Sequence, residues 1–353
     1  MPRRKYHNRK VVSCSKQTKK SNSSAGKNPE FDNPLVYFAQ EGKVAEVKQC
    51  INEGADVNKI LECTRGYNVL FMVIMAEPFT NDHLTVMEIL IAKGIDVSNH
   101  AWIEEKNQYT TLLHLAIVEE NIAALDMLIK NGAKLDYNTS ECLPLLHCAV
   151  EQASLKMTRA LLKHKWIRNL IDVKSSLCED TTALHNAIKN GYHDIALMLI
   201  ENGGNVNTQD HQDMFVIHDV AATGTVKMLK VLLEKGTNVN AKGFRNVSPL
   251  KMAIIHRQGE IVKVLLENGA DPNMTCIGGS TALHTSVMRN EMEEDNIIGT
   301  FIFRQLMDYG AKVNVKDKQD WYPLHFASKY GKTVEVNSML KNGALVDPMD
   351  ENG

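Results

Sequence analysis

The sequence predicts an all-α solenoid of about nine helix-turn-helix repeats that are joined by β-hairpin loops. Three observations support this fold class. A phrase of the form TALH…NGA recurs along the chain, its two markers keep a constant distance, and each copy has room for two short helices. Two marker positions identify the repeats along the chain.

The first marker is the last residue of the tetrapeptide xxLH. Four of its eight intervals are 33 residues long, and the others are 35, 38, 41 and 43. This period is typical of stacked helical repeats. The marker residues are Val36, Phe71, His114, His147, His185, His218, Lys251, His284 and His325.

The second marker is the glycine of NGA or a variant of it. It follows the first marker by 18 residues in most repeats, as His185 and Gly203 illustrate. Two markers that hold the same offset indicate a true structural repeat. These glycines are Gly54, Gly94, Gly132, Gly203, Gly236, Gly269, Gly310 and Gly343.

The repeat around His185 shows how each element is predicted. Ala187 and Ile188 lie on one helix, and Ile195, Leu199 and Ile200 lie at helical spacing on a second helix. The glycine that follows can take the left-handed conformation that ends a helix. The polar segment 208–216 then suits a hairpin turn. One such helix pair cannot bury its own apolar face, so neighbouring pairs must stack.

These residues resemble the ankyrin repeat, whose signature is T-P-L-H-x-A. The nearest copies are TALHNA, SPLKMA, TALHTS and YPLHFA, followed by LLENGADPN or LIENGGNVN. The resemblance covers about residues 33–353. We expect a disordered basic tail over 1–30 and an ankyrin-repeat domain over 31–353. The tetratricopeptide alternative lacks both the xxLH start and the Gly-Ala-Asp turn.

The charge distribution is uneven. Residues 1–28 hold nine of the 40 basic residues and no acidic one, so a basic tail precedes an acidic body. The composition of this tail predicts disorder. Its role is left open between a nuclear import signal, a weak nucleic-acid contact and a solubilising leader. The sequence has seven cysteines and shows neither a signal peptide nor a long apolar run. These features favour a location in the cytoplasm or the nucleus, and we expect no membrane partner.

Catalysis is not predicted anywhere in the chain. The marker histidines stand a whole repeat apart and fit hydrogen bonding at helix starts better than a metal site. Cys148 beside His147 fits a buried core position, and the CIGGST segment 276–281 fits a turn. We therefore expect no enzyme activity, no cofactor, no metal and no small-molecule substrate.

Partner-binding residues are expected where the repeats differ. The resemblance implies a groove on the concave face, lined by the first helices and the hairpin tips. Apolar and arginine side chains at tips are typical of binding hot spots, whereas packing against the next hairpin is the alternative. The candidate residues are Met214, Phe244, Arg245, Ile277, Lys318 and Trp321.

Insertions and the ends of the array depart from the pattern. His284 and Gly310 lie 26 residues apart around the acidic segment 290–296. This insertion suits either contact with a partner or a tolerated, solvent-exposed loop without a function. Glu46 and Glu335 replace apolar residues of the second helix, as expected for the outer face of a cap. Whether the repeats end at Gly353 or continue beyond it is left open.

The predicted function is a non-enzymatic scaffold or adaptor that binds another protein of unknown identity. Two alternatives from other classes remain open. One is the substrate-recognition part of a ubiquitin ligase adaptor, and the other is the N-terminal fragment of a larger ankyrin-containing enzyme or channel.

Overall fold

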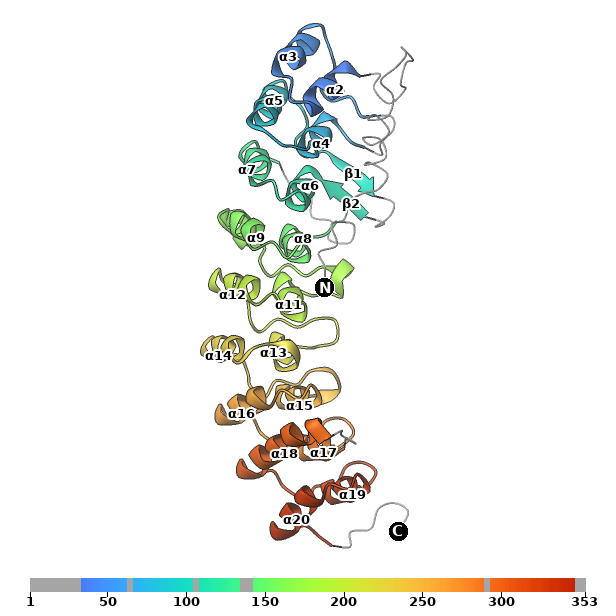
Figure 1. Ribbon diagram of the computed structural model, residues 1–353, viewed down its shortest axis with the longest axis vertical. Helices are drawn as coiled ribbons and strands as arrows, with labels where there is room; N and C mark the ends of the chain where they lie inside the picture. The colour runs from blue at the N-terminus through green and yellow to red at the C-terminus, as the bar shows by residue number, and fades with distance from the viewer. Residues whose placement is uncertain (1–32, 62–65, 104–107, 134–141, 289–292, 347–353) are drawn as a thin grey trace. The chain divides into compact units, whose positions relative to one another are not determined.

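The computed structural model describes residues 33–61, 66–103, 108–133, 142–288 and 293–346. The chain divides into two compact units, Met1–Asp136 and Tyr137–Gly353. The predicted tail over 1–30 lies outside the described residues. Each unit is built from helix pairs, as the repeat pattern predicts (Figure 1).

The first unit contains three helix pairs and one two-stranded sheet. Strands β1 and β2 are antiparallel, with His100 opposite Thr111 and Trp102 opposite Tyr109. They form a hairpin that is longer than most of the others, because Gly94 and His114 lie 20 residues apart, whereas Gly203 and His218 lie 15 apart. The pairs are α2 (Pro34–Gln40) with α3 (Val44–Asn52), α4 (Val69–Ile74) with α5 (Asn81–Ala92), and α6 (Leu112–Val118) with α7 (Ile122–Lys130); the strands are β1 (His100–Ile103) and β2 (Gln108–Thr111).

In its described residues, the second unit contains six helix pairs and three short helices. The pairs are α8 (Leu145–Glu151) with α9 (Leu155–Leu162), α11 (Ala183–Lys189) with α12 (His193–Glu201), α13 (Val216–Thr223) with α14 (Val226–Glu234), α15 (Pro249–Ile255) with α16 (Gly259–Glu267), α17 (Ala282–Val287) with α18 (Glu293–Asp308), and α19 (Pro323–Lys329) with α20 (Thr333–Lys341). The short helices are α10 (Lys165–Arg168), η4 (Ser176–Cys178) and η5 (Phe244–Asn246).

Two rows of helices make up the second unit. The first helices α8, α11, α13, α15, α17 and α19 pack against one another in order, and the second helices lie behind them. The hairpins project from the side of the first row, away from the second (Figure 1). Most of these hairpins are tight turns; single bridges join Ser175 to Thr181 and Gln209 to Phe215.

The core lies between the two rows. Leu184, Ala187 and Ile188 of α11 and Leu199 of α12 are almost fully buried. The alanine allows the first helices to approach closely, while the branched side chains fill the space between the rows. The apolar positions of the sequence pattern are therefore core positions.

Three marker histidines, His147, His218 and His284, connect neighbouring repeats and form what we call the histidine ladder. His284 Nδ1 lies 2.8 Å from Thr281 Oγ1, which caps the same helix, and His284 Nε2 donates to the Trp321 carbonyl at 3.1 Å. His218 donates to the Val247 carbonyl at 2.9 Å in the same way. These contacts confirm that the histidines are structural hydrogen-bonding residues.

Asparagines connect the turns on the opposite edge. Asn240 donates to the Gly269 carbonyl at 3.0 Å and accepts the N–H of Asp271 at 2.8 Å. The same pair of bonds recurs at Asn273 and Asn314. A regular ladder of this kind holds each turn at a fixed distance from the next.

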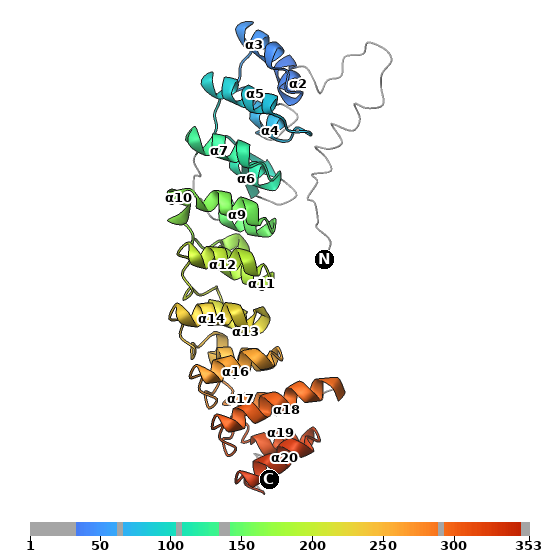
Figure 2. The same cartoon turned by 60° about the vertical axis from the view of Figure 1, so that its left-hand side comes forward.

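The insertion after His284 extends a helix. Helix α18 has 16 residues, whereas α16 and α20 have nine each. Its first turns project beyond its neighbours (Figure 2). Part of the acidic segment, residues 290–292, lies outside the described residues.

The expectation that Glu335 lies on an outer face is wrong. Glu335 is only 4% exposed, and its Oε1 accepts a hydrogen bond from Thr300 Oγ1 at 2.8 Å. The carboxylate is tolerated because α18 supplies a hydroxyl at the position that it faces. Its polarity therefore reflects a specific contact between α18 and α20.

Candidate interaction surface

Consecutive hairpin tips of the second unit are joined by backbone hydrogen bonds. The Ile277 N–H donates to the Arg245 carbonyl at 3.0 Å, and the Lys318 N–H donates to the Gly278 carbonyl at 3.0 Å. At an earlier tip, the His211 N–H donates to the Glu179 carbonyl at 3.3 Å. These bonds fix the tips relative to one another, so residues on them form a preorganised surface.

Phe244 and Arg245 form one of these tips. They lie in η5, where Arg245 adopts a left-handed φ of 55°. This sharp turn leaves Phe244 50% exposed. The Arg245 guanidinium lies 5.2 Å from the Phe244 ring centroid, which gives the tip an aromatic face with a positive edge.

Ile277 occupies the next tip and is 53% exposed. The turn depends on Gly279, which has a φ of 78°. A Cβ atom at this glycine would lie 3.0 Å from the Lys318 nitrogen, so a side chain would disturb the bond to the following tip. Lys318 is exposed there. Two apolar and two cationic side chains thus share one run of tips.

Met214 and Trp321 lie differently from the other four candidates. The Met214 sulfur accepts the Phe244 N–H at 3.3 Å and sits beneath the following hairpin. The Trp321 ring is 4.9 Å from that of Phe326, and Lys329 Nζ lies 5.1 Å from its centroid. Both side chains are half-buried. The packing alternative therefore describes their main contacts.

Leu177 is an exposed apolar tip residue that sequence reasoning missed. It lies in η4 and is 43% exposed. The signal was weak because its hairpin follows the repeat that lacks the NGA glycine, so the markers could not align it.

A charged cluster lies on the first-helix row behind the tips. Lys189 Nζ is 2.9 Å from Asp210 Oδ2 and 4.0 Å from Asp219 Oδ1. Burial raises the pKa of Asp219 to about 7, although Lys189 opposes this shift. Burial, together with the Lys189 charge, lowers the pKa of His185 to about 4. The cluster balances charge across α11, α13 and one hairpin.

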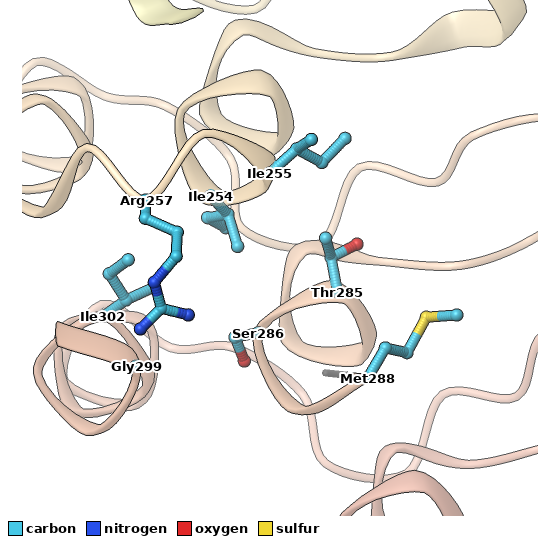
Figure 3. A pocket seen from close by; sticks show the side chains of 8 residues that line it. All are labelled: Ile254, Ile255, Arg257, Thr285, Ser286, Met288, Gly299 and Ile302. Atoms are coloured by element: carbon cyan, nitrogen blue, oxygen red, sulfur yellow. The ribbon is translucent and has the colours of Figure 1, made fainter. Parts of the chain in front are cut away.

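One cavity lies between α15, α17 and α18, with a volume of about 220 Å³. Figure 3 shows that aliphatic side chains dominate its lining, with Arg257 reaching toward α18 and the hydroxyls of Thr285 and Ser286 on α17. Among the residues that the structure describes, its lining contains no carboxylate, thiol or imidazole. The cavity is smaller than the roughly 300 Å³ at which ligand pockets begin.

Metal sites and membrane-spanning helices were considered for the part of the chain that the structure describes. There, no group of three or more histidine, cysteine or acidic residues is placed to hold a metal ion. Among the same residues, no helix combines the length and apolar character that crossing a bilayer requires.

The stacked helix pairs, the histidine ladder and the projecting hairpins define a helical repeat protein. A profile of ankyrin repeats in three copies matches residues 35–141, 113–210 and 204–276, which together cover about two thirds of the chain. The chain belongs to the ankyrin-repeat family. Ankyrin repeats generally mediate protein–protein interaction.

Several curated proteins are similar to parts of the chain. An ankyrin repeat protein of fowlpox virus is 27% identical over 161 residues, which is 45% of this chain and 22% of that protein. An ankyrin repeat protein of Acanthamoeba polyphaga mimivirus is 26% identical over 180 residues, 50% of this chain and 22% of that protein. The nuclear factor NF-kappa-B p105 subunit of Gallus gallus is 26% identical over 148 residues, 42% of this chain and 14% of that protein.

The matched region spans about a fifth or less of the length of these relatives. The similarity therefore concerns the repeats that the proteins share.

Proposed function

We propose that this protein is a non-enzymatic scaffold or adaptor, located in the cytoplasm or the nucleus. It captures a partner protein along the hairpin tips and the adjoining face of the first-helix row. The observation that supports this proposal is the pair of half-exposed apolar side chains, Phe244 and Ile277, on neighbouring tips that a backbone hydrogen bond joins.

The physical argument rests on the cost of ordering. A side chain that must be immobilised on binding costs roughly 0.5–1.5 kcal/mol. Phe244 is already placed by a turn whose backbone is fixed at Arg245 and bonded to Ile277. Large apolar groups on a rigid support are the composition of binding hot spots.

The charge of the tips indicates the chemistry of the partner. Lys242, Arg245 and Lys318 are exposed around the two apolar residues. A partner segment that combines apolar side chains with carboxylates would match both features. Complementary charge would mainly raise the association rate, and salt would lower it.

Site-specific photo-crosslinking tests the proposal and does not require the partner to be identified first. A photoreactive residue is placed at Phe244 or Ile277 and, as the matched control, at the exposed Lys230 of α14 on the second row. We expect a discrete adduct from both tip positions and none from Lys230. Adducts from Lys230 with none from the tips would place binding on the other row and overturn the proposal.

A second experiment uses the captured partner. Phe244→Ala combined with Ile277→Ala should weaken its binding at least tenfold, because two adjacent apolar anchors are removed. Leu340→Ala is the control, since Leu340 is also exposed, at 39%, but lies on α20. Equal losses in both variants would mean that the tips have no special role.

A further inference from the structure

One repeat replaces the marker histidine with lysine and pairs it with a cysteine. Lys251 Nζ lies 3.2 Å from Cys276 Sγ, 2.9 Å from Ser280 Oγ and 3.0 Å from the Ser280 carbonyl oxygen. Lys251 is only 8% exposed, so its ammonium group is held beneath the hairpin that starts at Cys276. In this arrangement a buried cation directly contacts a half-buried thiol.

This environment differs from those of three other described cysteines. Burial raises the pKa of Cys50, Cys142 and Cys178. Burial also acts on Cys276, but the hydrogen bond and charge of Lys251, with the backbone N–H groups of Gly278 and Ser280, lower its pKa below the ordinary value. A thiolate is the reactive form of cysteine, and adjacent cations are the environment in which reactive cysteines occur.

We propose that Cys276 and Lys251 form a peroxide-reactive pair in which hydrogen peroxide oxidises Cys276 to a sulfenic acid. The Cys276 thiolate attacks one oxygen of hydrogen peroxide, an S–O bond forms, and the O–O bond breaks. The Lys251 ammonium gives a proton to the departing hydroxide, which leaves as water. Sulfur loses two electrons, peroxide gains them, and the neutral lysine regains its proton from solvent.

The geometry suits each part of this step. Cys276 is half-buried, so its side chain keeps some exposure to solvent, while the buried Lys251 ammonium contacts its sulfur at 3.2 Å. The Ser280 oxygens hold the ammonium in place, so it need not reorganise when the leaving group forms. Because this chemistry does not depend on partner binding, it can be tested on the isolated chain.

The test treats the full chain with hydrogen peroxide at pH 7 and traps sulfenic acids with a 1,3-diketone probe. Peptide mass spectrometry then gives the labelling rate of each cysteine. Cys178 is the internal control, because it is also half-buried beside a hairpin, but burial and then the charges of Glu151 and Glu179 raise its pKa. We expect Cys276 to be labelled at least tenfold faster than Cys178. Equal rates would overturn the proposal.

A variant distinguishes activation of Cys276 by Lys251 from an effect of the solvent exposure of Cys276 alone. Lys251→His restores the residue that most other repeats have at this position. It should keep the stack folded while lowering the labelling rate of Cys276 about tenfold. An unchanged rate in folded Lys251→His would remove Lys251 from the mechanism and overturn the pairing.

The pH dependence of the wild-type chain provides a readout that needs no variant. The labelling rate of Cys276 should persist to a lower pH than that of Cys178, because its thiolate forms at lower pH. Coincident pH profiles for the two cysteines would contradict the proposal.

Discussion

The histidine ladder and the hairpin tips are parts of the same repeat, yet they differ in how tightly the fold constrains them. His218 is fully buried and bonds to the Val247 carbonyl of the next repeat. Phe244, on a tip of that next repeat, is half-exposed. The ladder transmits contacts from repeat to repeat and tolerates little change. The tips are held by their backbones, which leaves their side chains available for recognition.

Loss of a ladder histidine should have the largest effect on stability. His218→Ala removes a buried ring and leaves the Val247 carbonyl without its partner, so we expect a loss of roughly 2–4 kcal/mol in the free energy of unfolding. Urea denaturation measures this change. The control is His256→Ala, because His256 is exposed; it should change stability by less than about 0.5 kcal/mol. Similar losses in both variants would contradict the structural role of the ladder.

The ladder could be predicted from the sequence because its members recur. Because the histidines recur at one position of the repeat, their structural role could be predicted. The apolar residues beside them predicted the core. The tips could not be predicted in the same way. Met214 and Phe244 were both candidates, but whether a side chain lies on the next hairpin depends on a contact 30 residues away. The contact between Lys251 and Cys276 could not be predicted for the same reason, because the two residues lie 25 positions apart in the sequence.

Three buried titratable side chains on the first helices, His147, His185 and Asp219, should make stability depend on pH. His147 and His185 have pKa values lowered to about 4, so the unfolded chain binds protons first and stability falls as the pH drops from 6.5 toward 4. Asp219 acts in the opposite direction. Its pKa is raised to about 7, so its contribution to stability grows as the pH falls from 7 toward its unfolded value.

Asp219→Asn isolates this opposing effect. The neutral amide cannot take up the proton, so between pH 7 and pH 5 the variant should lose roughly 2 kcal/mol more stability than the wild type. Urea denaturation at several pH values gives both profiles. Parallel profiles would mean that Asp219 does not take up a proton over this range.

A smaller effect should connect the ladder to the tips at Gly243. A Cβ atom there would lie 2.6 Å from the Met214 sulfur and 3.1 Å from His218 Nε2. Gly243→Ala should therefore cost roughly 1 kcal/mol through overpacking. Because the sulfur is the nearer atom, Met214→Ala should recover most of that loss in the double variant. Additive losses in this double-mutant cycle would show that the Met214 sulfur is not the atom that clashes with the new Cβ atom.

The smallest effect on stability is expected at the open tips. Phe244→Ala and Ile277→Ala should each change the free energy of unfolding by less than about 0.5 kcal/mol, because these side chains contribute little buried area. Trp321→Ala is the matched aromatic change at a covered position, and it should cost roughly 2 kcal/mol through its contacts with Phe326 and His325. A stability loss at Phe244 as large as that at Trp321 would place Phe244 in the packing of the hairpins. A small loss there, combined with weakened partner capture, would mark the open tips as the part of the repeat that is available for binding.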